Sequence, residues 1–539
     1  MHDLFAAIDK PFIPPWDAPG VGLRPFAPEL VLIGTIVATL LAPFFTRKSN
    51  ILCAVVALAG LILALAVTVF VGPGTVEGPH FRSLMVVDQF AQLWKVLLLV
   101  FVCGVIVMWF STTASTMHEG DGPEFFTLLL SATLGMSLMA QTANLLMLFM
   151  CVELASLPSY VLAGFRKTNR IGAEASLKYV LFGAASSAVM VYGLSLLYGL
   201  YGTLAVDEIA QKMVSQAGPS GPGASALLAV SVFGLIVGIG FKISAVPFHF
   251  WCPDVFEGAS VDVTAFLSVA SKGAALALLL RVMMTFASAL GFHSVPGVSL
   301  TSVAVVIGVI GAVTATVGNT AAFVQTNIKR LLAYSSIAHA GYMLCAVSLL
   351  VRGAKAPSDF GLSGAAAQAI LLYLAVYMFM NLGAFTTAGL IWRETGSERI
   401  EDYAGLGRRS TILAICMTLF MFSLVGLPPL AGFNAKVFVL WALIQNGSWW
   451  WALVAVIGVN TVLSLYYYVR VVKVMFLNDS DAPAFIPNPI GLAVSVLCAV
   501  MLLGMFFGFN PLTSLTKTYA KMYVGGAPSS ETKTAALVP

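Results

Sequence analysis

Two stretches in opposite halves of the chain decide the fold. Residues 238–249 read Gly-Ile-Gly-Phe-Lys-Ile-Ser-Ala-Val-Pro-Phe-His, and residues 426–436 read Gly-Leu-Pro-Pro-Leu-Ala-Gly-Phe-Asn-Ala-Lys. Each stretch places one lysine, Lys242 or Lys436, close to a proline within a long apolar segment. Pro247 has no N–H to donate, so a carbonyl about one turn earlier is freed near Lys242. Paired interrupted helices in two halves of a membrane protein indicate a transport site at mid-membrane. Two ordinary proline kinks are the alternative interpretation.

The composition indicates an all-α polytopic membrane protein. The chain has 539 residues, of which 10% are charged and 59% hydrophobic, and its mean hydropathy is +0.93. Soluble domains carry roughly 25% charged residues, and a soluble fold of this length could not cover its surface with fewer than half as many. The same numbers exclude a disordered protein and a secreted disulfide scaffold. The net charge of +4 and the lack of a basic cluster exclude a nucleic-acid partner.

Long uncharged runs alternate with short polar loops along most of the chain. One span needs about 20 residues, and the runs predict about fourteen transmembrane helices. The expected spans are 29–45, 50–71, 90–110, 125–141, 144–164, 176–201, 225–246, 260–284, 300–320, 329–350, 366–392, 411–444, 449–476 and 489–509.

Lysine and arginine in the loops predict the orientation in the lipid bilayer. One side collects Arg47, Lys48, Arg166, Lys167, Arg170, Lys178, Lys329, Arg330, Arg393, Arg399, Arg408, Arg409, Arg470 and Lys473. The other side collects only Arg82, Lys212, Arg352 and Lys355. The first side is therefore expected to be cytoplasmic, which puts both termini outside the cytoplasm.

Four charges fall inside apolar segments: Glu153, Lys242, Lys272 and Lys436. A charge at this depth is expensive unless it faces a polar interior, so such residues mark ion or proton paths. Structural ion pairs and snorkelling side chains are the alternative for each one alone. Burial lowers the pKa of a lysine towards neutrality, and a nearby carboxylate raises it again. A Glu153–Lys242 pair could therefore switch the lysine between holding and releasing a proton.

Three further residues are candidate modulators of proton transfer. His339 could relay protons near Lys272 or Lys436, and His249 follows Pro247 closely. A hydrogen-bonded core histidine is the alternative for both. Lys178 could modulate the carboxylate of Glu153, or it could simply anchor the positive side.

Five charges near predicted helix ends have a simpler interpretation. Lys95 and Arg281 could snorkel to the membrane surface. Glu29, Glu257 and Asp262 lie near predicted helix starts, where a carboxylate favours the helix dipole.

The sequence predicts no cofactor or metal bound by this chain. Its seven cysteines are scattered and form no CxxC, and its six histidines form no recognisable haem-bracketing pair. It has no Walker A loop and no dinucleotide-binding glycine motif. Any proton pumping must therefore be powered from outside the chain.

The chain resembles the antiporter-like subunit N of bacterial respiratory complex I, the proton-translocating NADH–quinone oxidoreductase, whose mitochondrial counterpart is subunit 2. The matching segments are Ala27–Leu30, Glu153–Phe165, Glu174–Tyr179, Gly240–Trp251, Ser271–Lys272, Asn327–His339, Asp402–Leu406 and Gly426–Lys436. A lysine at position 436 fits subunit N better than a sister subunit that carries a glutamate there.

The resemblance implies two inverted five-helix repeats, each containing one broken helix. It divides the chain into 1–25, a proline-rich segment; 26–120, three helices; 121–290 and 291–480, the repeats; 481–510, the last helix; and 511–539, a polar tail. Glu153 would be the partner of Lys242, the proton-holding lysine of the first repeat. Lys272 would be the central connector and Lys436 the terminal lysine. Lys178 would lie near the Glu153–Lys242 pair.

The resemblance also implies a function, a location and partners. The chain would couple quinone reduction elsewhere to proton pumping in the bacterial inner membrane, beside other membrane subunits including sister antiporter-like subunits. NADH, FMN, iron–sulfur clusters and quinone would belong to partner subunits. The alternatives are a subunit of a cation/proton antiporter of the same superfamily, and a passive scaffold whose buried charges are structural.

Overall fold

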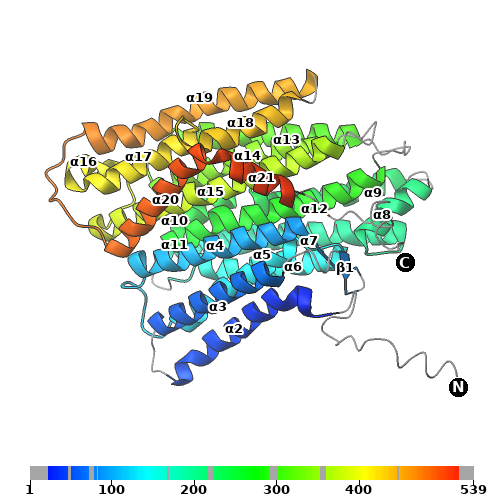
Figure 1. Cartoon of the computed structure of the whole chain (residues 1–539), viewed down its shortest axis with the longest axis horizontal. Helices are drawn as coiled ribbons and strands as arrows, with labels where there is room; N and C mark the ends of the chain where they lie inside the picture. The colour runs from blue at the N-terminus through cyan, green and yellow to red at the C-terminus, as the bar shows by residue number, and fades with distance from the viewer. Residues whose placement is uncertain are drawn as a thin grey trace, which may run out of the picture.

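The computed structural model is a bundle of helices that lie side by side along one direction (Figure 1). Helix α2 (Ala27–Phe45) lies at one edge of the bundle and α19 (Ser448–Leu477) at the opposite edge. The structure describes residues 22–45, 50–71, 78–81, 83–166, 169–216, 223–290, 300–351, 360–445, 448–520 and 522. Most of the predicted segments 1–25 and 511–539 therefore lies outside the described residues.

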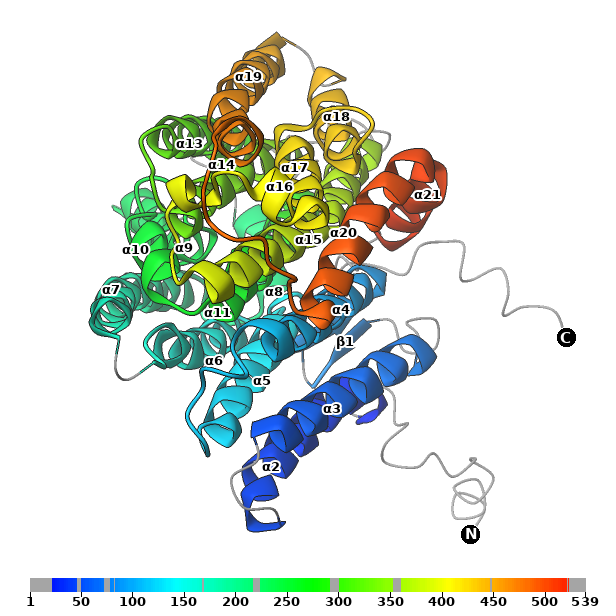
Figure 2. The ribbon, with the colours of Figure 1, turned by 90° about the vertical axis from the view of Figure 1, so that its left-hand side faces the viewer.

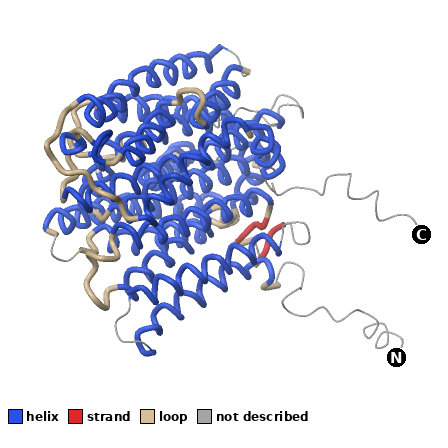
Figure 3. Tube along the Cα trace, turned by 60° about the vertical axis from the view of Figure 1, so that its left-hand side comes forward, coloured by secondary structure: helices blue, strands red, loops and turns tan. Residues whose placement is uncertain are grey.

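The N-terminal part consists of three helices and a hairpin. α2 packs on α3 (Asn50–Val71), and α3 packs on α4 (Gln89–Thr112). The short strands β1 (Gly78–His80) and β2 (Met85–Val87) pair antiparallel between α3 and α4. Figure 3 shows this hairpin, in red, at the end of the bundle near the N-terminus.

The middle of the chain forms the next group of helices. They are α5 (Gly122–Met139), α6 (Leu145–Ala163), α7 (Arg170–Tyr201), the short α8 (Val206–Ser215), α9 (Ala224–Ile243), α10 (Trp251–Gly258), α11 (Val261–Phe266) and α12 (Lys272–Leu290). One π-helical turn, Leu267–Ser271, connects α11 to α12.

The last group covers the rest of the chain. Its helices are α13 (Leu300–Ala322), α14 (Ile328–Val347), α15 (Phe360–Thr395), α16 (Leu406–Arg409), α17 (Thr411–Val425), α18 (Ala431–Ile444), α19, α20 (Pro489–Phe507) and α21 (Phe509–Tyr519). Among the described residues there are also three short 3₁₀ turns, Arg24–Phe26 before α2 and Ser348–Val351 and Ile400–Tyr403 in the last group.

The all-α membrane fold predicted from the composition is confirmed. Each of the expected spans coincides with one helix or with two consecutive helices. Among the described residues, 11 helices are long and apolar enough by themselves to cross a membrane. The expected span 411–444 is divided between α17 and α18, each too short to cross alone.

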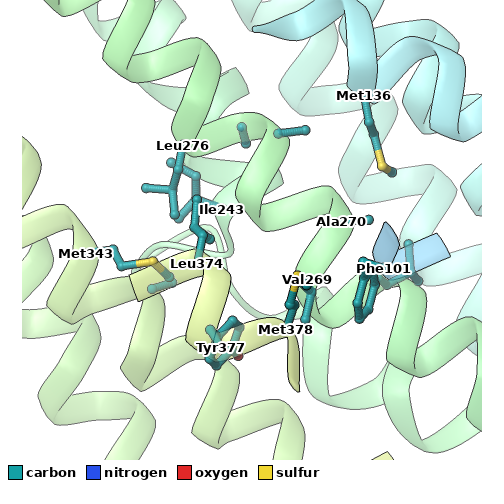
Figure 4. Packing of buried hydrophobic residues seen from close by; sticks show 14 of the residues in the cluster. Phe101, Met136, Ile243, Val269, Ala270, Leu276, Met343, Leu374, Tyr377 and Met378 are labelled. Carbon is teal, nitrogen blue, oxygen red and sulfur yellow. The ribbon is translucent and has the colours of Figure 1, made fainter. Parts of the chain in front are cut away.

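Two helices are enclosed by the others. In the segment Val261–Leu290 the most apolar stretch of 18 residues is 100% buried, and in Gly364–Thr395, within α15, it is 94% buried. The corresponding stretch of α3 is only 28% buried. Figure 4 shows the apolar packing around this centre, where Leu276 of α12 lies near Ile243 of α9 and Leu374 of α15. Charges on α12 and its neighbours are therefore shielded from lipid.

Both predicted interruptions are present. The cap residue of α9, Ser244, has a φ of 64°, which is uncommon for a residue other than glycine, and α10 begins after a short turn. The cap residue of α17, Gly426, has a φ of 87°, which suits the left-handed cap of a helix, and α18 begins at Ala431. The π-helical turn before α12 is a third irregularity, which the sequence did not predict.

Candidate functional site

Lys242 lies in the last turn of α9, at the first interruption. Its side chain is 1% exposed, and its Nζ has no hydrogen-bond partner among the described residues. The ring centroid of Tyr160, on α6, is 6.0 Å from this Nζ, at the limit of a cation–π contact. Lys242 is therefore a buried amine beside an aromatic ring, without a hydrogen-bond partner among the described residues.

Glu153 also lies on α6, two turns before Tyr160, and is half-buried. Its Oε1 accepts a hydrogen bond of 2.5 Å from Ser187 of α7. The charge of Glu153 acts on Lys242, but no direct ion pair joins these two described residues. The structure therefore places the predicted pair near each other with Tyr160 beside the lysine.

Several aromatic rings pack around Lys242. These rings were not predicted from the sequence as part of the site. Tyr160 packs edge-on against Tyr179 with ring centroids 4.6 Å apart. Tyr179 stacks on Trp251 at 4.2 Å. The indole Nε1 of Trp251 donates to the carbonyl of Phe241 at 3.0 Å. The Phe241 carbonyl also accepts the backbone N–H of Ser244 at 3.0 Å, so both of its lone pairs are used and Lys242 stays without a hydrogen-bond partner among the described residues.

Lys272 begins α12 and is 1% exposed. Its Nζ donates to Ser336 Oγ of α14 at 2.5 Å and lies 3.5 Å from Cys252 Sγ of α10. The Phe256 ring centroid is 5.6 Å away. Lys272 therefore joins the middle group of helices to the last group.

His339 lies on α14, one turn after Ser336, and is 2% exposed. Its Nδ1 and the hydroxyl of Tyr373 are 2.6 Å apart. The charges of both Lys272 and Lys436 act on this ring. His339 also packs against Tyr342, with ring centroids 5.6 Å apart, and the Tyr342 ring centroid lies 4.9 Å from Lys436 Nζ; its role in proton transfer stays a prediction.

Lys436 lies on α18 just after the second interruption and is 5% exposed. Its Nζ donates to the carbonyl of Val425 at 2.8 Å and lies 4.9 Å from the ring centroid of Tyr342, on α14. Val425 is the last residue of α17. Here the carbonyl freed by the interruption holds the lysine, unlike at the first interruption.

The structure does not place Lys178 in contact with Glu153. Its Nζ forms ion pairs with Asp254 of α10 at 2.8 Å and with Glu174 at 2.9 Å. Lys178 therefore belongs to a polar cluster at the end of the bundle.

Arg330, on α14, completes this cluster. It forms ion pairs of 2.7 Å with Asp254 and 2.8 Å with Glu257. Glu257 was expected to favour a helix dipole, and in the structure it is part of this bridge between α10 and α14. His249, between α9 and α10, is 8% exposed, and its Nδ1 has no partner among the described residues.

Two buried ion pairs correct the interpretation of charges near helix ends. Glu29 is fully buried and pairs with Lys95 at 2.6 Å, with Ser137 donating to the same carboxylate at 3.1 Å. Arg281 forms a two-pronged ion pair with Asp88, which also caps α4. The expectation that Lys95 and Arg281 reach the membrane surface is therefore wrong, because both cations are paired inside the bundle. Glu29 does more than favour the dipole of α2.

The described residues contain no group of three His, Cys, Asp or Glu that could hold a metal ion. The candidate site offers buried amines, hydroxyls and the imidazoles of His249 and His339, all of which can bind and exchange protons.

A fold of long helices with two interruptions, each beside a buried lysine, defines an antiporter-type membrane subunit. A family model described as "NADH:quinone oxidoreductase/Mrp antiporter, TM" matches residues 142–464. Proteins named NADH-quinone oxidoreductase subunit N are similar over most of the chain. The one from Anaeromyxobacter sp. is 42% identical over 85% of this chain and 88% of its own length. Subunit N 2 of Sorangium cellulosum is 40% identical over 90% and 94%. The chain therefore belongs to the NADH-quinone oxidoreductase subunit N family.

One solved structure agrees with this assignment, and a second shares the fold. A chain of respiratory complex I from Thermus thermophilus is 32% identical, with a TM-score of 0.72, covering 91% of this chain and 99% of that one. A chain of the Mrp complex from Dietzia sp. shares the fold, with a TM-score of 0.76 at 20% identity, covering 92% and 97%.

Proposed function

We propose that this chain is the proton-translocating membrane subunit of a bacterial NADH–quinone oxidoreductase and that Glu153, Lys242, Lys272 and Lys436 carry its protons. The observation that carries this proposal is the row of three buried amines, one at each interruption and one between them. Family membership supports the complex, and the geometry of the lysines supports the path.

The path between the last two amines runs along α14. Lys272 contacts Ser336, His339 follows one turn later, and Tyr342 lies against Lys436. The Ser336 hydroxyl donates to the carbonyl of Ala333 at 2.7 Å, so it must turn before it can take a proton from Lys272 and give its own to a base further along α14, where His339 is the acceptor.

The first amine has a different task. Lys242 has no hydrogen-bond partner among the described residues, so its proton is held only by packing and by the field of Glu153. A change of charge at Glu153 then alters how firmly Lys242 holds its proton. Glu153 is half-buried, so a partner subunit can reach it and set that charge.

The energy comes from partner subunits in this proposal. NADH, FMN, iron–sulfur clusters and quinone belong to them, and this chain has no redox centre of its own. Other membrane subunits, including sister antiporter-like subunits, lie beside it in the bacterial inner membrane. The arginine-rich and lysine-rich loops face the cytoplasm and both termini face outward. Residues 121–290 and 291–480 are the two inverted repeats.

A cation/proton antiporter is the competing function, because the matched family model also covers Mrp antiporters. The observation against it is the chemistry of the path. Ammonium groups repel Na⁺, which needs oxygen ligands, and the path is lined by Lys242, Lys272 and Lys436. A passive scaffold is the third possibility, and it predicts damage to assembly rather than to pumping.

The test is Lys242→Ala in the intact complex, with Lys473→Ala as the matched control. Lys473 is exposed on α19, so it tests the loss of a lysine alone. The proposal expects normal assembly on native gels and a large loss of quinone-linked proton pumping for Lys242→Ala only. Normal pumping by an assembled Lys242→Ala complex overturns the path. Failure of assembly with normal pumping per assembled complex supports the scaffold.

Co-purification tests the complex independently. Recovery of the chain with quinone-reducing and iron–sulfur subunits supports the proposal. Recovery alone or with small antiporter subunits, together with Na⁺ flux in vesicles, supports the antiporter.

A further inference from the structure

A buried amide side chain, that of Asn319, joins three helices close to Lys436. Asn319 lies near the end of α13 and is 0% exposed. α13 packs on both α14 and α19, and Figure 2 shows these three helices together on the side of the bundle that α19 borders. The Nδ2 of Asn319 donates to the hydroxyl of Tyr342, on α14, at 2.9 Å and to Oδ1 of Asn460, on α19, at 3.0 Å. Its Oδ1 accepts a hydrogen bond from the hydroxyl of Tyr467, also on α19, at 2.9 Å.

The partners of this amide fix which way round it lies. The carbonyl of Ala315, one turn earlier in α13, can only accept, and it lies 2.9 Å from Nδ2 of Asn319. The NH₂ group therefore faces Ala315 and Tyr342, and Oδ1 faces Tyr467. The hydroxyl of Tyr342 accordingly accepts a hydrogen from Asn319.

Close backbone packing of α13 on α14 fixes the distance between these two side chains. Gly318 directly precedes Asn319, and Gly341 directly precedes Tyr342. A Cβ atom at Gly318 would lie 2.6 Å from a backbone nitrogen of α14, and one at Gly341 would lie 2.4 Å from a backbone nitrogen of α13. Small residues at such positions let two helices approach to backbone contact. Asn319 and Tyr342 therefore face each other across the tightest part of this helix pair.

The ring of Tyr342 is the surface against which Lys436 lies. Its centroid is 4.9 Å from the Nζ of Lys436, within the range of a cation–π contact, and Tyr342 is 1% exposed. The backbone of α14 holds one end of the tyrosine side chain, and Asn319 holds the hydroxyl at the other end. A ring that is held at both ends presents its face in one orientation.

We propose that Asn319 is a positioning residue for Lys436, which acts by binding the hydroxyl of Tyr342 and so holding the aromatic face against the ammonium group. The amide of Asn319 does not titrate and takes no proton itself. It keeps the lysine nitrogen in one place while that nitrogen gains and loses a proton. This inference rests on the proposed function, since it needs Lys436 to carry protons.

The test is a double-mutant cycle in the intact complex, with Asn319→Leu, Tyr342→Phe and the two combined. Each single variant should lower proton pumping per assembled complex about two- to tenfold, the scale of one neutral hydrogen bond. The double variant should pump no worse than either single one, because both changes remove the same contact. A purely structural role for Asn319 predicts a further loss in the double variant, since Tyr467 and Asn460 also lose their partner.

Tyr342→Phe keeps the inference testable if Asn319→Leu does not assemble. It retains the ring, and the amide of Asn319 still has Asn460 and Ala315 as acceptors, so no buried donor is left without a partner. Full pumping by assembled Tyr342→Phe, or additive losses in the cycle, overturns the positioning role.

Asn460→Leu is the matched control. Asn460 is 2% exposed, and its described hydrogen bonds go to Asn319, Thr316 and the carbonyl of Val456, not to Tyr342. Its pumping per assembled complex should stay near that of the parent, even if less complex assembles. An equal loss of pumping in Asn460→Leu and Asn319→Leu overturns the inference, because a general loosening of the helices then explains both.

Lys436→Ala in the same preparation separates this inference from the proposed function. If Lys436→Ala loses pumping while Asn319→Leu and Tyr342→Phe pump fully, the lysine path stands and Asn319 does not position it. If Lys436→Ala also pumps normally, the proposed path itself fails.

Discussion

Lys272 of α12 donates a 2.5 Å hydrogen bond to Ser336 of α14, and this contact joins the two groups of helices at the centre of the molecule. Both side chains are buried, at 1% and 0% exposure, so water does not substitute for either partner. The contact links the buried amine of Lys272 to α14, the helix that also carries His339 and Tyr342.

Ser336→Ala should therefore slow proton transfer without preventing folding. A hydrogen bond to a charged group contributes about 1.5–3 kcal/mol, and loss of such an interaction in the transfer step lowers turnover roughly tenfold or more. NADH–quinone reductase turnover and proton pumping should fall together in membranes.

Ser231→Ala is the control, because Ser231 is equally buried but donates only to a carbonyl of its own helix, at 2.7 Å. Equal turnover in the two variants contradicts the role of Ser336.

Trp251→Phe should make the first interruption behave like the second. The Phe side chain keeps most of the packing against Tyr179 but leaves the carbonyl of Phe241 without its indole donor. The Phe241 carbonyl still accepts the N–H of Ser244 at 3.0 Å, but its second lone pair becomes open to Lys242, as the Val425 carbonyl is open to Lys436. The lysine should hold its proton more firmly, and pumping should slow while assembly stays intact. Trp109→Phe is the control, because its buried indole nitrogen has no partner among the described residues. Unchanged pumping by both variants would contradict the role of the Trp251 indole in keeping the Phe241 carbonyl from Lys242.

Glu29→Ala should destabilise the N-terminal helices. Removing one partner of a buried ion pair leaves an uncompensated charge, which costs about 3–5 kcal/mol. The thermal midpoint of the purified complex and the yield of assembled subunit should both fall. Replacing both partners, with Glu29→Gln and Lys95→Met together, should recover part of the loss. The exposed pair of Arg408 and Asp479 provides the control, since Asp479→Asn should change the midpoint very little.

Gly432→Ala should prevent the start of α18 from packing against the end of α17. A Cβ atom at Gly432 would lie 1.8 Å from the carbonyl oxygen of Ser423, which is backbone and cannot move aside cheaply. The variant should give little assembled subunit. Gly458→Ala, on α19, meets nothing within 4 Å and should assemble normally. Normal assembly of Gly432→Ala would show that α17 and α18 pack less tightly than described.

The sequence predicts the interruptions well because their causes are local. A proline lacks a donor wherever it stands, so Pro247 and Pro428 mark the breaks without knowledge of any neighbour. The lysines beside them follow from the same stretches. The overall class is equally local, since it depends on apolar runs of sufficient length.

The hydrogen-bond partners of those lysines cannot be predicted from local sequence features. Ser336 is 64 residues from Lys272, and only the packing of α12 on α14 brings them together. The sequence places Glu29 and Lys95 each near a helix end and does not show that they pair, because the pairing depends on how α2 and α4 meet across α5.

The π-helical turn Leu267–Ser271 has a consequence for how the centre of the molecule is encoded. Such a turn holds one residue more than an α-helical turn, and each residue rotates a helix by about 100°. Deleting any single residue from the turn would leave every proton-carrying group in the chain, yet it would swing Lys272 away from Ser336. The direction in which the Lys272 side chain points is therefore set by the length of this segment as well as by its residue types. A deletion of one codon would separate Lys272 from Ser336 without changing the chemistry of either half of the chain.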